Sequence, residues 1–256
     1  MTDFSYQLYS SRNFPPLEDT LKMLAVAGYA EVEGVGSMFD DPGTLPALRD
    51  TLDANGLRMS TTHAGLDMLQ SDPDRIIEAA RVLGIQDIYV PYLAEENRPG
   101  DAQGWADFGK TLSEAAKPIV DAGLLFGWHN HDFEFADLGG SDRPIDLLLA
   151  ASDAIHFEFD LAWGVRAGID PAIWVERYGS RISSAHLKDI APAGECTDED
   201  GWADLGYGVV DWSSLLPALI AGGTKHFVME HDNPNDHQRF AKRSIESARK
   251  FAGASS

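Results

Sequence analysis

A (β/α)8 barrel, also called a TIM barrel, is the fold class that this sequence of 256 residues predicts. Stretches typical of strands and of helices alternate eight times, and strands connected through helices form parallel sheets. A length of roughly 250 residues suits one such barrel. Residues 10–14, after the first expected strand, lack the glycine-rich phosphate turn of a doubly wound sheet, so that open sheet is the less favoured alternative.

The expected strands are short runs rich in apolar and β-branched residues, each bounded by residues that favour turns. We expect them at residues 5–9, 29–35, 57–63, 87–91, 124–131, 155–160, 182–187 and 225–230. The fifth, sixth, seventh and eighth of these strands are expected to be neighbours, because successive strands of such a barrel lie side by side.

Several of the expected helices have proline or aspartate near their start and glycine near their end, which are residues that commonly begin and end helices. We expect them at residues 15–28, 41–56, 72–84, 103–122, 145–151, 170–179, 210–223 and 236–251. The longest irregular insertion, residues 194–208, carries Asp198, Glu199, Asp200 and Trp202 and is a candidate lid.

Composition limits the possible partners. The chain is 44% hydrophobic, enough for a full core, and we expect residues 1–256 to form one domain. A balance of 20 basic against 41 acidic residues gives a net charge of −21, which repels nucleic acid and anionic membranes. The one cysteine, Cys196, excludes an internal disulfide and a cysteine-based zinc site. With neither a signal peptide nor a run of ~18 apolar residues, the sequence predicts a cytoplasmic protein.

The stretch 127–135 concentrates ionisable side chains behind an apolar run. His129 and His131 are two residues apart, so they share a face if the fifth strand continues through both. Asp132 and Glu134 follow in the expected loop. A strand whose last residues turn ionisable is typical of a barrel active site, whereas a polar surface loop is the alternative.

The ends of the other expected strands carry residues of the same kind. Imidazole and carboxylate groups together suit Mn²⁺, Co²⁺, Fe²⁺, Zn²⁺ or Mg²⁺, with open positions for water or substrate. Lys188, two residues after His186, is placed to reach a substrate oxygen, and Trp163 is a candidate pocket wall. The candidate residues at strand ends are Glu33, His63, His129, His131, Asp160, His186 and Glu230.

Five stretches together resemble the sugar phosphate isomerase/epimerase family of xylose isomerase-like barrels. This family is related to inosose dehydratases, ketose 3-epimerases and endonuclease IV. The resemblance spans nearly the whole chain and is specific for the fold and the metal centre rather than for the substrate. The stretches are Trp128-His-Asn-His-Asp-Phe-Glu-Phe135, Phe159-Asp-Leu-Ala-Trp163, Ala185-His-Leu-Lys-Asp189, Gly206-Tyr-Gly-Val-Val-Asp-Trp212 and Val228-Met-Glu-His-Asp232.

The resemblance implies one divalent ion, most often Mn²⁺, held by Glu, Asp, His and Glu from the fifth to the eighth strand. Asp160, His186 and Glu230 match the last three ligands. For the first ligand the sequence offers His129 on the strand and Glu134 in the loop. We assign Glu134, because hard ions favour carboxylates, and keep His129 among the catalytic residues.

The resemblance also implies a metal-dependent isomerase or epimerase that acts on a keto-sugar through an enediolate. Glu230 on one side and His131, or Glu134, on the other are the candidate bases, and His63, Trp163 and Lys188 are the candidate substrate contacts. Dehydration of a keto-sugar, keto-glycoside or inosose is an alternative, as is a non-catalytic sugar-binding barrel. Phosphodiester hydrolysis on DNA is disfavoured by the charge of −21. A homo-oligomer is possible.

Overall fold

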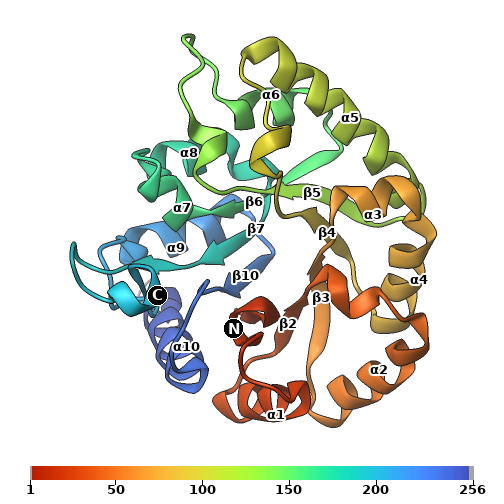
Figure 1. The fold of residues 1–256 in the computed structure, drawn as a ribbon. Helices are drawn as coiled ribbons and strands as arrows, with labels where there is room; N and C mark the ends of the chain where they lie inside the picture. The colour runs from red at the N-terminus through yellow and green to blue at the C-terminus, as the bar shows by residue number, and fades with distance from the viewer. Residues whose placement is uncertain (1, 254–256) are drawn as a thin grey trace.

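The computed structural model describes residues 2–253 and shows a closed barrel of eight parallel strands (Figure 1). Around the barrel the strands follow the order β1-β10-β7-β6-β5-β4-β3-β2. The predicted fold class is therefore confirmed. The strands are β1 (Ser5–Gln7), β2 (Glu31–Gly34), β3 (Arg58–His63), β4 (Asp87–Val90), β5 (Leu125–His129), β6 (Ile155–Asp160), β7 (Ile182–Leu187) and β10 (His226–Met229).

The eight expected helices are all present and surround the strands as an outer ring (Figure 1). Three of them, α1, α4 and α9, end at a glycine with positive φ: Gly28, Gly84 and Gly223. The helices are α1 (Leu17–Ala27), α2 (Leu45–Ala54), α4 (Pro73–Leu83), α5 (Ala102–Asp121), α6 (Pro144–Ala150), α8 (Pro171–Tyr178), α9 (Trp212–Gly222) and α10 (His237–Gly253).

Several short elements were not predicted. The helices α3 (Leu66–Ser71) and α7 (Leu161–Arg166) have six residues each, too few to show a helical periodicity. The irregular insertion and the residues before it contain an antiparallel pair, β8 (Asp189–Ile190) and β9 (Trp202–Ala203).

Two predicted strands, β1 and β5, end two residues earlier in the structure than expected. β1 gives way to a 3-10 helix, η1 (Leu8–Ser11). β5 ends at His129, so the prediction that this strand runs through His131 is wrong. His131 lies in the loop before the 3-10 helix η5 (Phe133–Phe135). Its ring centroid is still 5.2 Å from that of His129.

Parallel register places the polar residues of the later strands in two adjacent rows. His129 of β5 pairs with Glu158 of β6, and Asp160 of β6 pairs with His186 of β7. Glu158 and Asp160 are two residues apart, so both point into the barrel, while the alternating Phe157 and Phe159 point outward. The two rows form the floor of the site. Within residues 2–253, none of the helices is long and apolar enough to cross a membrane.

Candidate metal and catalytic site

A cavity of about 410 Å³ opens at the carboxyl end of the barrel, where a barrel carries its chemistry. His63, His129, His131 and Glu230 are among the residues that line it, together with Tyr92. Four of the residues predicted from strand ends and from the loop after β5 therefore surround one space. Its volume lies in the range usual for small-molecule sites.

Four buried side chains at the floor of this cavity could hold a metal ion, and we call them the outer group: His129, Asp160, His186 and Glu230. They come from β5, β6 and β7 and from the residue directly after β10, and their donor atoms lie within 4.8 Å of one another. His186 Nδ1 is 3.0 Å from Glu230 Oε2 and 4.0 Å from Asp160 Oδ2. The structure thus brings together three of the four predicted ligands.

Asp160 carries a buried oxygen that is free to bind a cation. Its Oδ1 accepts a hydrogen bond from the backbone N–H of Trp163 and so caps the start of α7. Its Oδ2 accepts no hydrogen bond from the part of the chain that the structure describes. Burial raises the pKa of this carboxyl to about 7, although Lys188 opposes the shift. An unsatisfied buried carboxylate oxygen is costly, and a bound cation would remove that cost.

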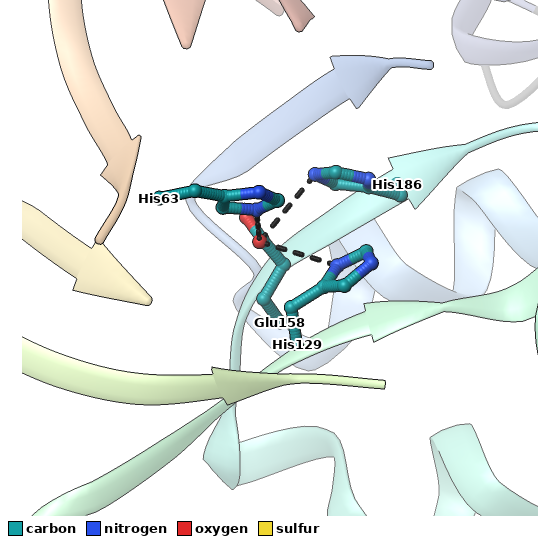
Figure 2. A group of neighbouring side chains, drawn as sticks. All are labelled: His63, His129, Glu158 and His186. Carbon is teal, nitrogen blue, oxygen red and sulfur yellow. Dashed lines mark hydrogen bonds and ion pairs between the residues drawn. The ribbon is translucent and has the colours of Figure 1, made fainter. Parts of the chain in front are cut away.

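A second set of buried side chains, the inner group, lies next to the first (Figure 2): His63, His129, Glu158 and His186. Glu158 Oε2 sits between three imidazoles, 2.6 Å from His63 Nε2 and 3.4 Å from both His129 Nδ1 and His186 Nε2. Sequence reasoning did not single out Glu158. The alternation of phenylalanine and acid in residues 157–160 is the signal that could have identified it.

Glu33 supports the inner group from β2. Its Oε1 accepts hydrogen bonds from His186 Nε2, at 2.8 Å, and from Gln7 Nε2, at 2.7 Å. The sequence indicates Glu33 as a candidate at the end of the second strand, without a specific role, and it gives no signal for Gln7. Burial opposes protonation of His186, but Glu158, Glu230 and Glu33 outweigh it and hold the pKa of His186 well above its ordinary value.

The structure places Glu134 outside both groups, although the sequence analysis assigned it as a ligand. Both of its oxygens are engaged: Oε1 accepts a hydrogen bond from Trp128 Nε1, and Oε2 accepts one from the backbone N–H of His131, each at 2.9 Å. Burial raises the pKa of Glu134 to about 8. Of the two candidates near the fifth strand, His129 is the one that lies in the outer group. Glu134 instead fixes the loop that presents His131.

His131 stands at the cavity wall among aromatic rings. Its ring centroid is 5.1 Å from that of Tyr92 and 5.0 Å from that of Trp163. Burial and the neighbouring His129 and Lys188 lower the pKa of His131 well below its ordinary value. The imidazole is therefore neutral near neutral pH and able to accept a proton.

Lys188 lies behind the outer group rather than in the lining of the cavity. Its buried ammonium is 2.5 Å from Asp232, 3.1 Å from Glu230 and 3.7 Å from Asp160. It also lies 4.2 Å from the ring centroid of Trp202, whose β9 packs over this side of the site. Trp163, the predicted pocket wall, is also absent from the residues that line the cavity, and its ring centroid is 4.7 Å from that of Trp202. Asp232 was not singled out as a separate candidate.

A closed parallel barrel with ionisable side chains gathered at the carboxyl ends of its strands defines the class of TIM-barrel proteins. Residues 21–251 match the family described as Xylose isomerase-like TIM barrel, and the chain belongs to this family. The resemblance noted in the sequence is thereby confirmed.

Named relatives differ in their reactions. The inosose dehydratase of Geobacillus kaustophilus (strain HTA426) is 25% identical over 200 residues, a match that covers 68% of this chain and 62% of the relative. A sugar phosphate isomerase/epimerase from Parabacteroides distasonis ATCC 8503 is 20% identical, with 98% of this chain and 95% of that chain covered and a TM-score of 0.79. The IolI protein with a bound zinc atom is 16% identical, with 99% of each chain covered and a TM-score of 0.71. At 20% and 16% identity, the two solved structures show that the chain has their fold.

Proposed function

We propose that this protein is a divalent-metal-dependent enzyme that isomerises or epimerises a keto-sugar or a related carbohydrate. The reaction would move a proton at the carbon beside the substrate carbonyl. The observation that carries the proposal is the outer group: donors from four neighbouring strands converge within 4.8 Å beneath a cavity of about 410 Å³. The family and the names of its relatives support the carbohydrate class.

Asp160, His186 and Glu230 would hold the ion, with His129 as the fourth side chain within reach. The mixed carboxylate and imidazole donors suit Mn²⁺, which we propose first, and also Zn²⁺, Co²⁺, Fe²⁺ or Mg²⁺. When bound, the ion supplies electrostatic stabilisation of the negative charge that develops on the substrate oxygens. The unsatisfied Oδ2 of Asp160 supports this placement.

His131 and Glu230 are the proposed proton carriers. Both line the cavity and both are in a proton-accepting form. His131 is neutral because its pKa is lowered, and Glu230 is ionised because Lys188 and His186 outweigh the effect of burial and hold its pKa well below the ordinary value. A substrate bound between them presents its C–H bond to one base. Return of a proton to the opposite face inverts the carbon, and return to the adjacent carbon isomerises the sugar.

The proposed substrate contacts are residues that line the cavity. His63 keeps the role expected from the sequence, with Tyr9 and Tyr92 as further walls. Lys188 and Trp163, proposed from the sequence as direct contacts, take a supporting role. Lys188 neutralises the carboxylates of the outer group, and Trp163 packs against His131.

Dehydration is the second candidate, because the curated relative is named an inosose dehydratase. Elimination begins with removal of the same proton beside the carbonyl. It differs in that a β-hydroxyl then leaves as water, which requires a proton donor. His131 would supply that proton once it has been protonated.

Hydrogen exchange tests the proposal without knowledge of the product. With the Mn²⁺-reconstituted protein in D₂O, a keto-sugar or inosose from a panel should gain deuterium beside its carbonyl or be converted to product. Chelation should stop the reaction, and His131→Asn should slow it by roughly 10²-fold. Glu176→Gln, at an exposed position, is the control that should leave the rate unchanged. Equal conversion in excess chelator would contradict metal dependence.

A further inference from the structure

The inner group has the arrangement of a second cation site. Glu158 Oε2 faces three imidazole nitrogens that come from three other strands: β3, β5 and β7 (Figure 2). All four residues are buried, and their donor atoms lie within 4.8 Å of one another. The proposed reaction needs only the outer ion, and it gives no role to Glu158, the carboxylate at the centre of the inner group.

The spacing of the donors fits a tetrahedral ion. Metal–ligand bonds of ~2.1 Å at tetrahedral angles place neighbouring ligand atoms about 3.4 Å apart. Glu158 Oε2 is 3.4 Å from His129 Nδ1. The shorter separation of 2.6 Å between Glu158 Oε2 and His63 Nε2 is that of two atoms sharing a proton, which a cation would displace.

Two buried atoms, one in the inner group and one in the neighbouring Glu33, have no hydrogen-bond partner among the residues that the structure describes. His129 Nδ1, on a residue 2% exposed, makes no hydrogen bond within residues 2–253. The same holds, among the described residues, for Oε2 of Glu33, a fully buried carboxylate whose other oxygen is 3.4 Å from His63 Nε2. Buried polar atoms normally have a hydrogen-bond partner, so an imidazole nitrogen without one that lies 3.4 Å from a carboxylate oxygen is suited to bind a cation.

The two groups share His129 and His186. His129 would bind the inner ion through Nδ1, and the two ions would not compete for a nitrogen of His186. His186 turns Nδ1 toward the outer carboxylates, while its Nε2 donates a hydrogen bond to Glu33 Oε1 at 2.8 Å. A carboxylate that accepts the second N–H of a ligating histidine holds that ring in place. The outer ion then keeps Asp160, His186 and Glu230, with its remaining positions open to substrate oxygens.

We propose that the barrel binds a second divalent cation at an inner site formed by His63 Nε2, His129 Nδ1 and Glu158 Oε2, with Glu33 as a neighbouring carboxylate. Two imidazoles and one carboxylate favour Zn²⁺ over Mn²⁺ or Mg²⁺. The negative charges of Glu158 and Glu33 balance the dication, which a buried ion requires. His63 and His129 line the cavity, so the inner ion is reached from the same opening as the outer one.

Metal stoichiometry tests the inner site. The full chain is stripped of metal, incubated with Zn²⁺, gel-filtered and analysed by mass spectrometry for bound zinc. We expect two equivalents for the wild-type protein, one for Glu158→Gln and one for Asp160→Asn. Glu176→Gln, an exposed matched control, should retain two. Circular dichroism of each metal-free variant checks its folding, and His63→Gln replaces Glu158→Gln if the latter does not fold.

The possible outcomes separate this inference from the proposed function on which its outer ion rests. One equivalent in the wild-type protein, lost in Asp160→Asn but kept in Glu158→Gln, overturns the inner site and leaves the proposed function intact. No bound zinc in the wild-type protein overturns both. Anomalous diffraction at the zinc edge from the wild-type protein needs no variant: two peaks support the inner site, and a single peak at the outer group overturns it.

Discussion

His186 is one of two side chains, with His129, that belong to both the outer and the inner group. Its Nδ1 is 3.0 Å from Glu230, and its Nε2 is 2.8 Å from Glu33. Both partners are buried carboxylates, so the ring is held from two sides. A histidine fixed in this way needs little reorganisation when a metal ion replaces its proton.

The roles of His129 and Glu134 can be separated by metal content. Glu134→Gln should keep its metal, because both oxygens of Glu134 are engaged by Trp128 and His131. The new amide N–H₂ would face one of these donors, which should destabilise the fold by about 1–3 kcal/mol. His129→Ala should instead lose metal. Elemental analysis and thermal unfolding of both variants check this, and metal loss in Glu134→Gln would restore Glu134 as the ligand.

Lys188 should matter most when no metal is bound. Its ammonium neutralises Asp160, Glu230 and Asp232 in a buried position. Lys188→Met leaves these carboxylates without their cation, which should cost about 3–5 kcal/mol in the free energy of unfolding. Added Mn²⁺ should recover part of that loss. Chemical unfolding with chelator and with Mn²⁺ measures the difference, and Lys110→Met, at an exposed position, is the control. Equal losses with and without metal would contradict this role.

Some residues of the site could be predicted from the sequence, and others could not. Asp160, His186 and Glu230 could be found because they end strands and match family motifs. Glu158 was missed because it lies inside a strand, where the spacing that reveals it resembles ordinary strand alternation. For the ligand near the fifth strand, the sequence set the preference of hard ions for carboxylates, which favours Glu134, against strand geometry, which favours His129. The contacts that engage both oxygens of Glu134 are tertiary and could not be read from the sequence.

At the scale of elements, a charged cluster closes the amino end of the barrel. His226, Asp87 and Glu31 are the first residues of β10, β4 and β2, which are not neighbours in the sheet. They meet across the barrel interior, with His226 3.5 Å from Glu31 and 3.4 Å from Asp87. This end lies opposite the site, so its effect should be on stability rather than on turnover.

The cluster should make stability depend on pH. Burial lowers the pKa of His226, but hydrogen bonds to Asp87 and Glu31 outweigh it and raise the value to about 9. Because the folded pKa is above the unfolded value of ~6.5, the stabilisation is fully present below pH ~6.5 and is lost as pH rises through about 9. With a pKa of about 9 in the folded state and ~6.5 in the unfolded state, the loss should be about 3 kcal/mol. Urea unfolding from pH 6 to pH 10 measures it, and His226→Gln should flatten the profile; an unchanged profile would contradict this assignment.

Elements were predictable to the extent that they were long and periodic. The eight strand–helix units follow from apolar runs and helix punctuation over many residues. The short helices α3 and α7 and the β8–β9 pair depend on tertiary contacts that the sequence does not display locally. One such contact is the hydrogen bond from the backbone N–H of Gly206 to Asp189 Oδ2, at 2.9 Å.

At the scale of the whole molecule, the net charge of −21 determines which charged partners the protein attracts or repels. A field of this sign repels polyanions, so we expect no binding to DNA, although the sequence resembles a family related to endonuclease IV. A gel-shift assay with an abasic duplex at low salt, where electrostatic attraction would be strongest, checks this. A retarded band that weakens as salt is added would contradict the prediction and revive the hydrolase alternative.

The central claim is that the outer group holds a divalent ion, and anomalous diffraction tests it most directly. Crystals of the protein reconstituted with Mn²⁺ are measured above and below the manganese absorption edge. We predict an anomalous-difference peak at about 2.0–2.3 Å from each of Asp160 Oδ2, His186 Nδ1 and a Glu230 oxygen. Crystals of Asp160→Asn should show no such peak. Anomalous peaks found only at exposed carboxylates, with no peak at the outer group, would contradict this claim.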